Sequence, residues 1–313
     1  NIHRIWQDGQ AEKLAEAVRT ALAEGIGQLG RKLGKAPQGI WAAGNTAMEH
    51  LLMRLDTASL GRYPFTPVSL EEMELLPEPE YKGPRIGLLP GISAFVGADI
   101  AAGLLACGFG ERREESCRLF IDLGTNGEMA AVGKGRLICT ATAAGPAFEG
   151  GAAANVPGTD MIALLAEMLE TGIIDESGLL EDAYFEKGWQ KGALRITQQD
   201  IRALQMAKAA VCAGVELLME ALEIGASDVE QVFLAGGFGY YLDVEKAARI
   251  GLFPAELADK VTAVGNTSLL GTCLYGGDPS LREKTKDLCR RSEVMNLAEQ
   301  PGFEERYLAR LNF

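Results

Sequence analysis

One acidic residue stands between an apolar run and a glycine-rich turn in "RLFIDLGTNGEMAAVGKGRL", residues 118–137. Asp122 ends the apolar run, and Gly124, Thr125, Asn126 and Gly127 follow it. Small residues let backbone N–H groups approach phosphate oxygens, because no Cβ stands in the way. The carboxylate is suited to hold Mg²⁺ through water, since Mg²⁺ dehydrates reluctantly. Taken alone, the stretch is also typical of an ordinary hairpin with Asn-Gly at its turn.

A second glycine-rich stretch, "FLAGGFG" at residues 233–239, ends another apolar run. The adjacent Gly236 and Gly237 each cost roughly 0.5–1 kcal/mol of backbone entropy if they only continue regular structure. They favour a flat group, such as a nucleotide base or sugar, passing close to the backbone. The alternative is a tight turn from a strand into a helix.

Lys208 lies in line with the apolar stripe of the helix expected over residues 200–223, between Leu204 and Val211. An unpaired charge in a dry core costs several kcal/mol. The side chain therefore either extends to the surface or lies in a polar cleft. In a cleft, Lys208 and Gln205 would contact a ribose or a phosphate.

Composition excludes several classes of protein. The 313 residues are 47% hydrophobic and 23% charged, which is ordinary for a globular protein, and the length allows two subdomains. A formal charge of −13 argues against nucleic acid and anionic membranes as partners, although ATP remains possible because backbone N–H groups and Mg²⁺ bind its phosphates. The absence of any run of ~18 apolar residues predicts no membrane helix.

The six cysteines form no CxxC pair, and the two histidines lie far apart, which disfavours a zinc or iron–sulfur site within this chain. Reduced thiols in the cytoplasm are the expectation.

The pattern of the first part, residues 1–115, predicts a first subdomain. Apolar residues at helical spacing predict a helix over 10–33 with Leu14, Val18, Leu22, Ile26, Leu29 and Leu33 on its buried face. A strand at 39–44 and a helix at 45–55 follow, and 95–110 reads as a turn before a glycine-interrupted helix. Six prolines in residues 61–91 predict an extended excursion across the surface.

Residues 116–313 form the second predicted subdomain. Residues 117–142 predict a β-meander, and 143–151 a glycine-rich loop. Two stretches, 229–243 and 261–276, each read as a strand, a glycine turn and a helix. Strands alternating with helices, with glycines at strand ends, indicate an α/β architecture with a mixed sheet.

Five segments in this order resemble the C-terminal ATPase domain of the reductive activators of corrinoid proteins, a branch of the actin-like ATPase superfamily. They are "GNTAMEHLLM", "LPGISAFVGADIAAG", "IDLGTNGEMA", "TAAGPAFEGG" and "LAGGFG". The resemblance spans most of residues 40–275. It implies an actin-like ATPase (ribonuclease H-like) fold, with two subdomains around a nucleotide cleft.

The resemblance also implies a function: ATP binding and hydrolysis, with Mg²⁺, help to reduce a partner corrinoid (cobalamin) protein from Co(II) to Co(I). Asp122 and residues 124–127 match the phosphate loop, and "LAGGFG" with Gly236, Gly237 and Phe238 matches the adenosine loop. The connecting segments are Gly44, Asn45 and Thr46 in one place, and Gly265, Asn266 and Thr267 in the other. The electron is expected to come from a [2Fe–2S] domain upstream, and a homodimer is common in this family.

Asp99 resembles the acid that activates the attacking hydroxyl in sugar kinases, and here it would orient a water. Its alternative role is the N-cap of the helix that follows. The superfamily has two phosphate hairpins, whereas this chain has one DxGT and begins with the helix expected after the first. We therefore expect weak nucleotide binding by this chain alone, and upstream segments in a longer protein. A small-molecule kinase and a non-catalytic docking module are the alternative functions.

Overall fold

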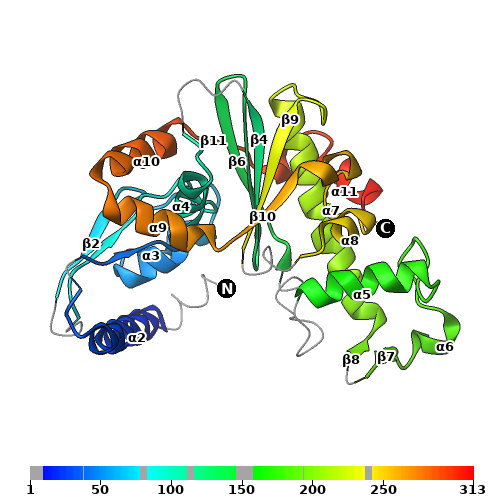
Figure 1. The fold of residues 1–313 in the computed structure, drawn as a ribbon, viewed down its shortest axis with the longest axis horizontal. Coiled ribbons are helices and arrows are strands. Elements are labelled where there is room, and N and C mark those ends of the chain that lie inside the picture. The colour runs from blue at the N-terminus through cyan, green and yellow to red at the C-terminus, as the bar shows by residue number, and fades with distance from the viewer. Residues whose placement is uncertain are drawn as a thin grey trace. The chain divides into compact units, whose positions relative to one another are not determined.

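The computed structural model describes residues 10–37, 39–77, 83–110, 116–145, 158–192, 194–236 and 242–313. The chain divides into two compact units (Figure 1). The first unit is Asn1–Gly110 with Thr267–Ser292, and the second is Glu111–Asn266 with Glu293–Phe313. No helix of the described residues is long and apolar enough to cross a membrane.

The first unit takes two helices from late in the chain, so the division differs from the predicted subdomains at 1–115 and 116–313. These helices are α9 (Thr267–Gly277) and α10 (Pro279–Arg291). Helix α9 packs directly on α4 (Ala98–Ala106) at Gly271, where a Cβ would stand only 1.8 Å from the Ala102 carbonyl oxygen. A backbone contact this close joins segments that are far apart in sequence, and local patterns do not reveal it.

The second unit is built on a six-stranded sheet in the order β10-β9-β4-β5-β6-β11. Strands β4, β5 and β6 form the predicted antiparallel meander, while β9 and β10 add in parallel beside β4. The strands are β4 (Cys117–Leu123), β5 (Gly127–Gly133), β6 (Arg136–Thr142), β9 (Val229–Ala235), β10 (Val261–Gly265) and β11 (Glu293–Val294). The mixed α/β sheet expected from the sequence is confirmed.

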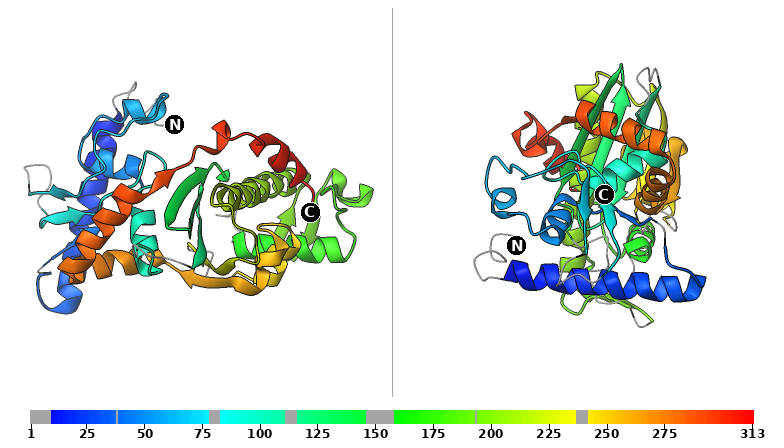
Figure 2. Two further views of the ribbon diagram at one scale, coloured as in Figure 1. Left: turned by 90° about the horizontal axis from the view of Figure 1, so that it is seen from above. Right: turned by 90° about the vertical axis from the view of Figure 1, so that its left-hand side faces the viewer.

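Helix α7 (Gln198–Ala221) packs on β5 and β6 of this sheet. It begins with a capping box in which Thr197 and Asp200 bond each other's backbone N–H groups. Figure 2 shows the unit from two further directions. The remaining elements of the second unit are α5 (Gly158–Glu170), α6 (Asp182–Phe185), β7 (Trp189–Lys191), β8 (Leu194–Ile196), α8 (Val244–Arg249), η4 (Ala255–Lys260), η5 (Leu297–Glu299) and α11 (Phe303–Ala309).

The first unit has a three-stranded sheet in the order β1-β3-β2, and it corrects the prediction for residues 61–91. Two of its strands, and the buried side chains of Leu75, Ile86 and Leu88, lie in the region expected to cross the surface. Three-residue strands between prolines carry no readable period, which explains the error. The unit's other elements are β1 (Trp41–Ala42), α3 (Thr46–Leu52), η1 (Ala58–Gly61), β2 (Met73–Leu75) and β3 (Ile86–Leu88).

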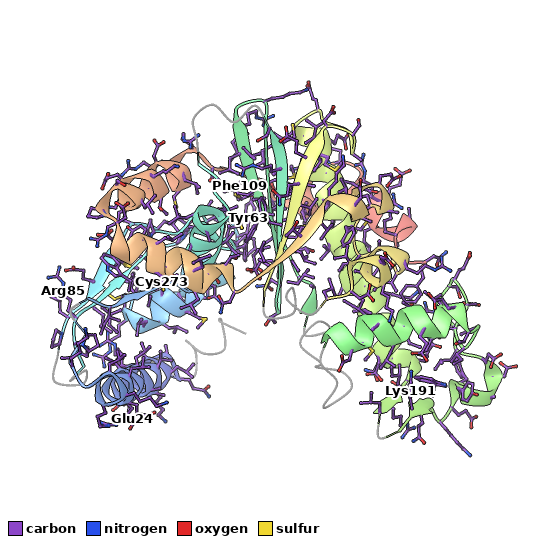
Figure 3. The ribbon with its side chains drawn as sticks, in the orientation of Figure 1. Glu24, Tyr63, Arg85, Phe109, Lys191 and Cys273 are labelled. Atoms are coloured by element: carbon purple, nitrogen blue, oxygen red, sulfur yellow. The ribbon has the colours of Figure 1, made fainter. Side chains whose placement is uncertain are left out.

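Helix α2 (Gln10–Leu33) has the predicted bounds, but only part of the predicted face is buried. Leu22 and Ile26 pack against the core of β2 and β3, whereas Leu29 and Leu33 are 56% and 63% exposed. The right-hand view of Figure 2 shows the helix along its length, and Glu24 lies on it (Figure 3). The core of this unit is shorter than the 24-residue helix, so burial is limited to the helix middle.

The contact at Gly271 gives the first prediction. Gly271→Ala is expected to destabilise the protein by about 1–3 kcal/mol, because the neighbouring atoms are backbone and cannot move aside. Gly277→Ala is the matched control, since no atom lies within 4 Å of a Cβ there. Denaturant unfolding measures both. Equal stabilities of the two variants would contradict the close α4–α9 packing.

Candidate functional site

Three parallel strand ends meet at one edge of the second unit's sheet. In the register of β4, β9 and β10, Asp122 lies beside Ala235, and Ala235 lies beside Gly265. Because neighbouring parallel strands end at the same edge, residues 122, 235 and 265 come together there. The structure thus brings together Asp122, Gly236 and Gly265, which the sequence analysis singled out separately.

Gly236 makes the closest backbone contact at this edge. Its φ of +104° is in the region that favours glycine, and a Cβ would stand 2.5 Å from the Leu123 carbonyl oxygen and 2.9 Å from Asp122 Oδ1. Its N–H donates to the Gly265 carbonyl at 3.1 Å. The glycine is therefore required by packing against Asp122. Gly237 and Phe238, assigned with it to the adenosine loop, lie outside the described residues.

The hairpin turn after Asp122 differs from the predicted one. Leu123 pairs with Gly127, so residues 124–126 form the turn, and the Gly124 N–H donates to the Asn126 carbonyl at 2.9 Å. Gly127 belongs to β5, where a Cβ would stand 2.9 Å from Val211 Cγ2 of α7. The prediction that Asn126-Gly127 makes the turn is right for Asn126 and wrong for Gly127, which already pairs with Leu123 in β5.

Glu128 is a residue of this site that the sequence analysis missed. It pairs with Asp122 across the β4–β5 ladder, and its carboxylate accepts a hydrogen bond from Asn126 Nδ2 at 3.2 Å. Only 9% of it is exposed. The hairpin register would have revealed it, because directly opposed residues share one face of a sheet.

The hairpin residues suit a phosphate group and a hydrated Mg²⁺. A Cβ at Gly124 would meet nothing closer than the Asn126 carbonyl oxygen at 3.9 Å, and Thr125 and Asn126 of the same turn are exposed. Over the described ranges, no cluster of three or more His, Cys, Asp or Glu side chains is placed to hold a metal ion. A Mg²⁺ held at this hairpin would take most of its ligands from phosphate and water.

Lys208 and Gln205 are placed differently from what the sequence suggested. Both side chains are only 1% exposed. Gln205 Nε2 donates to the Leu311 carbonyl at 3.0 Å, and Lys208 Nζ donates to the Asn312 carbonyl. Both hydrogen bonds fix the residues that follow α11. Lys208 Nζ also lies 5.1 Å from the centre of the Phe313 ring. Burial lowers the pKa of Lys208 from 10.5 to about 8. The side chain therefore does not extend to the surface, and its role as a nucleotide contact stays a prediction.

In the first unit, the segment Gly44–Thr46 is held by hydrogen bonds. Asn45 is the N-cap of α3, and its Oδ1 accepts from the Met48 N–H at 2.9 Å. Thr46 Oγ1 donates to the Ser93 carbonyl at 2.6 Å. The Gly44 carbonyl accepts from the N–H groups of Ala98 at 3.0 Å and Asp99 at 3.2 Å, at the start of α4. This segment lies within one unit, whereas the chain passes between units at Asn266 and Thr267.

Asp99 lies in the first turn of α4 and is not its N-cap, which is Gly97. Its Oδ1 accepts from the Ile100 N–H at 2.9 Å, and burial raises its pKa. A second acid, Glu49 of α3, is 6% exposed and accepts from the Gly44 N–H at 3.3 Å. The sequence alone does not mark Glu49 as buried, because a charged residue in a short helix usually faces water.

Thr267 begins α9 in the first unit. It is 2% exposed, and its hydroxyl has no hydrogen-bond partner among the described residues. A buried hydroxyl in this position is a candidate contact for a ligand or an ordered water. Its neighbour Asn266 belongs to the second unit.

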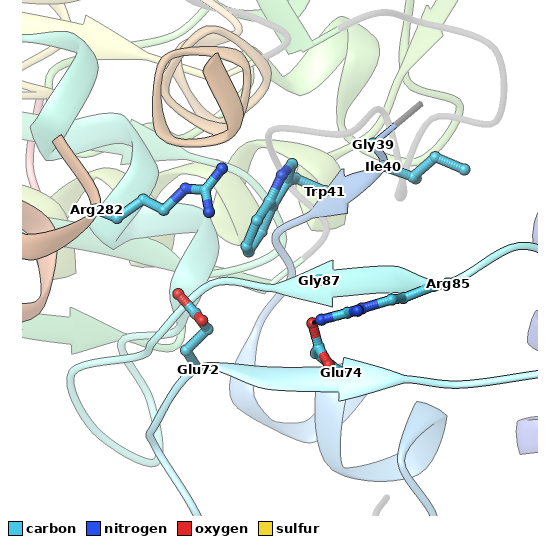
Figure 4. Close-up of a pocket in the computed structure, with 8 residues that line it drawn as sticks. All are labelled: Gly39, Ile40, Trp41, Glu72, Glu74, Arg85, Gly87 and Arg282. Carbon is cyan, nitrogen blue, oxygen red and sulfur yellow. Dashed lines mark hydrogen bonds and ion pairs between the residues drawn. The ribbon is translucent and has the colours of Figure 1, made fainter. Parts of the chain in front are cut away.

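A separate pocket of about 410 Å³ lies over the sheet of the first unit (Figure 4). Its charged groups have partners within the chain: the Arg282 guanidinium lies 4.3 Å from the Trp41 ring centre, Glu72 accepts from the Tyr275 hydroxyl, and Arg85 pairs with Glu74. The first two contacts hold α10 and α9 on the sheet, and the third joins β2 to the start of β3. The lining residues are Gly39, Ile40, Trp41, Glu72, Glu74, Arg85, Gly87 and Arg282.

The strand-end contact gives a prediction for Gly236. Gly236→Ala is expected to destabilise the protein by about 1–3 kcal/mol, because the Cβ would meet the Leu123 carbonyl at a strained φ. Gly135→Ala is the control, since its φ of +73° is also positive while no atom lies within 4 Å. Denaturant unfolding compares the two variants. A Gly236 variant no less stable than the control would contradict the contact.

The burial of Lys208 gives another prediction. Lys208→Met is expected to cost about 1–3 kcal/mol of stability, because the Asn312 carbonyl loses a charged donor. The Phe313 N–H, which donates to the Glu176 carbonyl at 2.8 Å, should then exchange faster with solvent. Hydrogen exchange measures this, with the exposed Lys187→Met as control. Unchanged exchange together with weaker ATP binding would favour the nucleotide role instead.

Comparison with known proteins finds related sequences along the whole chain. A model described as the C-terminal domain of RACo, the ASKHA domain, matches residues 116–155 and 152–313, and a model of the RACo middle region matches residues 2–112. The corrinoid activation enzyme RamQ of Eubacterium limosum is 31% identical to this chain, over an alignment that covers 96% of this chain and 61% of RamQ.

Two further relatives also carry names that refer to corrinoid proteins. The [Co(II) methylated amine-specific corrinoid protein] reductase of Methanosarcina barkeri is 28% identical over 233 residues, covering 58% of this chain and 42% of its own. A solved reductive activator for corrinoid,iron-sulfur protein superposes with a TM-score of 0.87 at 28% identity, covering 100% of this chain and 59% of that chain. The chain thus spans about three fifths of RamQ and of the solved activator.

The ASKHA model matches more than half of the chain, and the solved activator shares its fold throughout. This chain belongs to the RACo family and has the family's ASKHA, or actin-like ATPase, fold.

Proposed function

We propose that this chain is the ATP-binding and ATP-hydrolysing region of an activator that reduces a corrinoid protein from Co(II) to Co(I). The observation that carries the proposal is the edge of the second unit's sheet, where Asp122 and Gly236 lie in contact beside an open turn, in a chain of the RACo family. The names of RamQ and of the Methanosarcina reductase both refer to corrinoid proteins or their activation, which supports a corrinoid protein as the partner of this chain.

The hairpin of the second unit is proposed to bind the phosphates. Backbone N–H groups of the turn 124–126 would face phosphate oxygens, and the Asp122 carboxylate would accept hydrogen bonds from the waters of Mg²⁺. When bound, Mg²⁺ neutralises charge on the phosphate oxygens. Glu128 fixes the turn through Asn126 Nδ2. Gly236 lets the end of β9 pack directly against Asp122, because a Cβ there would meet the Leu123 carbonyl oxygen and Asp122 Oδ1.

Asp99 of the first unit is proposed to orient the water that attacks the terminal phosphate. As a carboxylate, it would accept a hydrogen bond from that water and direct a lone pair toward phosphorus. Hydrolysis of ATP with one water yields ADP and phosphate. The single electron that converts Co(II) to Co(I) comes from a reduced iron–sulfur donor, for which a [2Fe–2S] domain in a longer protein is the expected source.

Asp122 is the residue to change first. Asp122→Asn is expected to lower Mg²⁺-dependent ATP hydrolysis by about 10–100-fold, the usual cost of losing a carboxylate that orients metal-bound water. Phosphate release measures the effect. Asp182→Asn, at an exposed acid on α6 of the same unit, is the control. Normal hydrolysis by a folded Asp122 variant would show that the phosphate-loop assignment is wrong.

The proposed function itself is tested with the chain in its natural polypeptide, a reduced iron–sulfur donor and a matched corrinoid protein. The absorbance of the corrinoid is followed with and without ATP, and ATP is expected to promote formation of Co(I). A phosphorylated small molecule in place of free phosphate would indicate a kinase. A well-folded protein that leaves Co(II) unchanged with ATP would refute the proposal.

A further inference from the structure

The pocket over the sheet of the first unit has no role in the proposed function. Its volume of about 410 Å³ is typical of small-molecule sites, and all the residues that line it belong to the first unit (Figure 4). One wall is the indole ring of Trp41, which lies directly against two glycines. A Cβ at Gly87 would stand 2.4 Å from Trp41 Cζ3, and a Cβ at Gly276 would stand 2.5 Å from Trp41 Cδ1. This packing fixes the ring, so the wall is formed without a ligand.

The two carboxylates of the pocket each have a cationic partner. Glu74 accepts a hydrogen bond from Arg85 Nε at 2.6 Å, and Figure 4 shows the two side chains together across β2 and β3. Glu72 pairs with Lys286 Nζ at 3.4 Å. Lys286 also pairs with Glu283 at 3.2 Å, but the Glu283 side chain is 72% exposed and water screens its charge. The cations Arg85 and Lys286 are therefore matched by carboxylates of the chain itself.

Arg282 of α10 also lines the pocket, and no carboxylate of the described residues forms an ion pair with it. Its Nε donates to the Tyr275 carbonyl at 3.0 Å, and its Nη2 donates to the Gly276 carbonyl at 2.9 Å. Its guanidinium lies over the Trp41 ring, 4.3 Å from the ring centre (Figure 4). None of these partners carries a negative charge. A guanidinium has five N–H groups, so Arg282 keeps donors for a further acceptor.

The charges of the pocket favour a ligand with one negative charge. A carboxylate would supply the counter-ion that Arg282 lacks, and its two oxygens match the planar donors of a guanidinium. A dianion such as a phosphate ester is disfavoured, because Glu72 and Glu74 would repel its second charge. An uncharged ligand would leave Arg282 without a counter-ion. The apolar side chains of Ile40 and Trp41 line the same pocket and suit the hydrocarbon part of a small organic acid.

We propose that this pocket binds a small organic monocarboxylate, and that Arg282 binds the carboxylate group. The two ion pairs of the pocket, Glu72 with Lys286 and Glu74 with Arg85, select against ligands with two negative charges. The site lies within the first unit, so it goes beyond the proposed ATPase function and does not depend on it.

Three probes that share one ring test the charge of the ligand: benzoate, benzamide and phenyl phosphate. The chain in its natural polypeptide is labelled with fluorotryptophan, and the ¹⁹F resonance of Trp41 is identified by its loss in Trp41→Phe. Benzoate is expected to shift this resonance saturably. Benzamide and phenyl phosphate are expected to bind at least about tenfold more weakly, because the first lacks the charge and the second carries an extra one. No response to benzoate, or an equally tight response to phenyl phosphate, would overturn the proposal.

The role of Arg282 is tested by removing its charge. Arg282→Gln is expected to weaken benzoate binding about 10–100-fold, because the carboxylate loses a charged donor. Arg290→Gln is the matched control, since Arg290 is an exposed residue of the same helix and does not line this pocket. Both variants change the net charge by the same amount. Equal benzoate affinities of the two variants would show that Arg282 does not bind the carboxylate.

A second pair of variants keeps every charge and every contact of Arg282. Gly39 lines the pocket, and a Cβ there meets no atom within 4 Å, so Gly39→Leu is expected to fill part of the pocket without a clash and to abolish benzoate binding. Gly277→Leu is the control, because a Cβ at Gly277 also meets no atom within 4 Å and Gly277 does not line the pocket. This pair decides the location of the site even if Arg282→Gln does not fold. Unchanged benzoate binding by Gly39→Leu would contradict the assignment of the pocket.

Discussion

The close approach of backbone to backbone at Gly236 is the constraint on which the site in the second unit depends. Strands β4, β9 and β10 run in parallel, so their ends share one edge of the sheet. The chain leaves β9 at Gly236, which has a positive φ and whose N–H donates to the Gly265 carbonyl. There is no space for a Cβ at Gly236, because the Leu123 carbonyl lies too close. A side chain there would separate β9 from β4 and displace Asp122. One position without a Cβ thus joins three segments that are far apart in sequence.

The first unit uses a glycine in a related way. Gly44 lies just after β1 and Gly265 is the last residue of β10, and in both Gly-Asn-Thr segments the glycine carbonyl accepts an N–H from a neighbouring element. The partners differ: Gly44 binds the start of α4, whereas Gly265 binds Gly236. In each unit, a fixed glycine backbone lies close to an acid. Each of these acids has a second acid nearby, Glu49 for Asp99 and Glu128 for Asp122.

Sequence patterns predicted elements well where a period was long. The bounds of α2, the meander of β4 to β6 and most of α7 followed from apolar spacing. The sequence patterns gave wrong predictions where contacts between distant segments decided which residues are buried or form a turn. The apolar residues of α2 outnumber the core positions available to them, so Leu29 and Leu33 remain exposed. The three-residue strands β2 and β3 are too short to show an apolar period. Gly127 is a glycine because a Cβ there would clash with Val211 of α7, and not because it forms a turn.

By itself, the sequence determined the family and the α/β class, and it singled out the acids Asp99 and Asp122 as candidates, because short motifs of glycines and acids are encoded within a few consecutive residues. Only the tertiary structure decided which of those segments meet. It assigned α9 and α10 to the first unit, where Gly271 packs against Ala102, and it turned Lys208 and Gln205 toward residues 311–313. Burial and backbone contact between distant segments decide such pairings, and neither leaves a periodic signal in the chain.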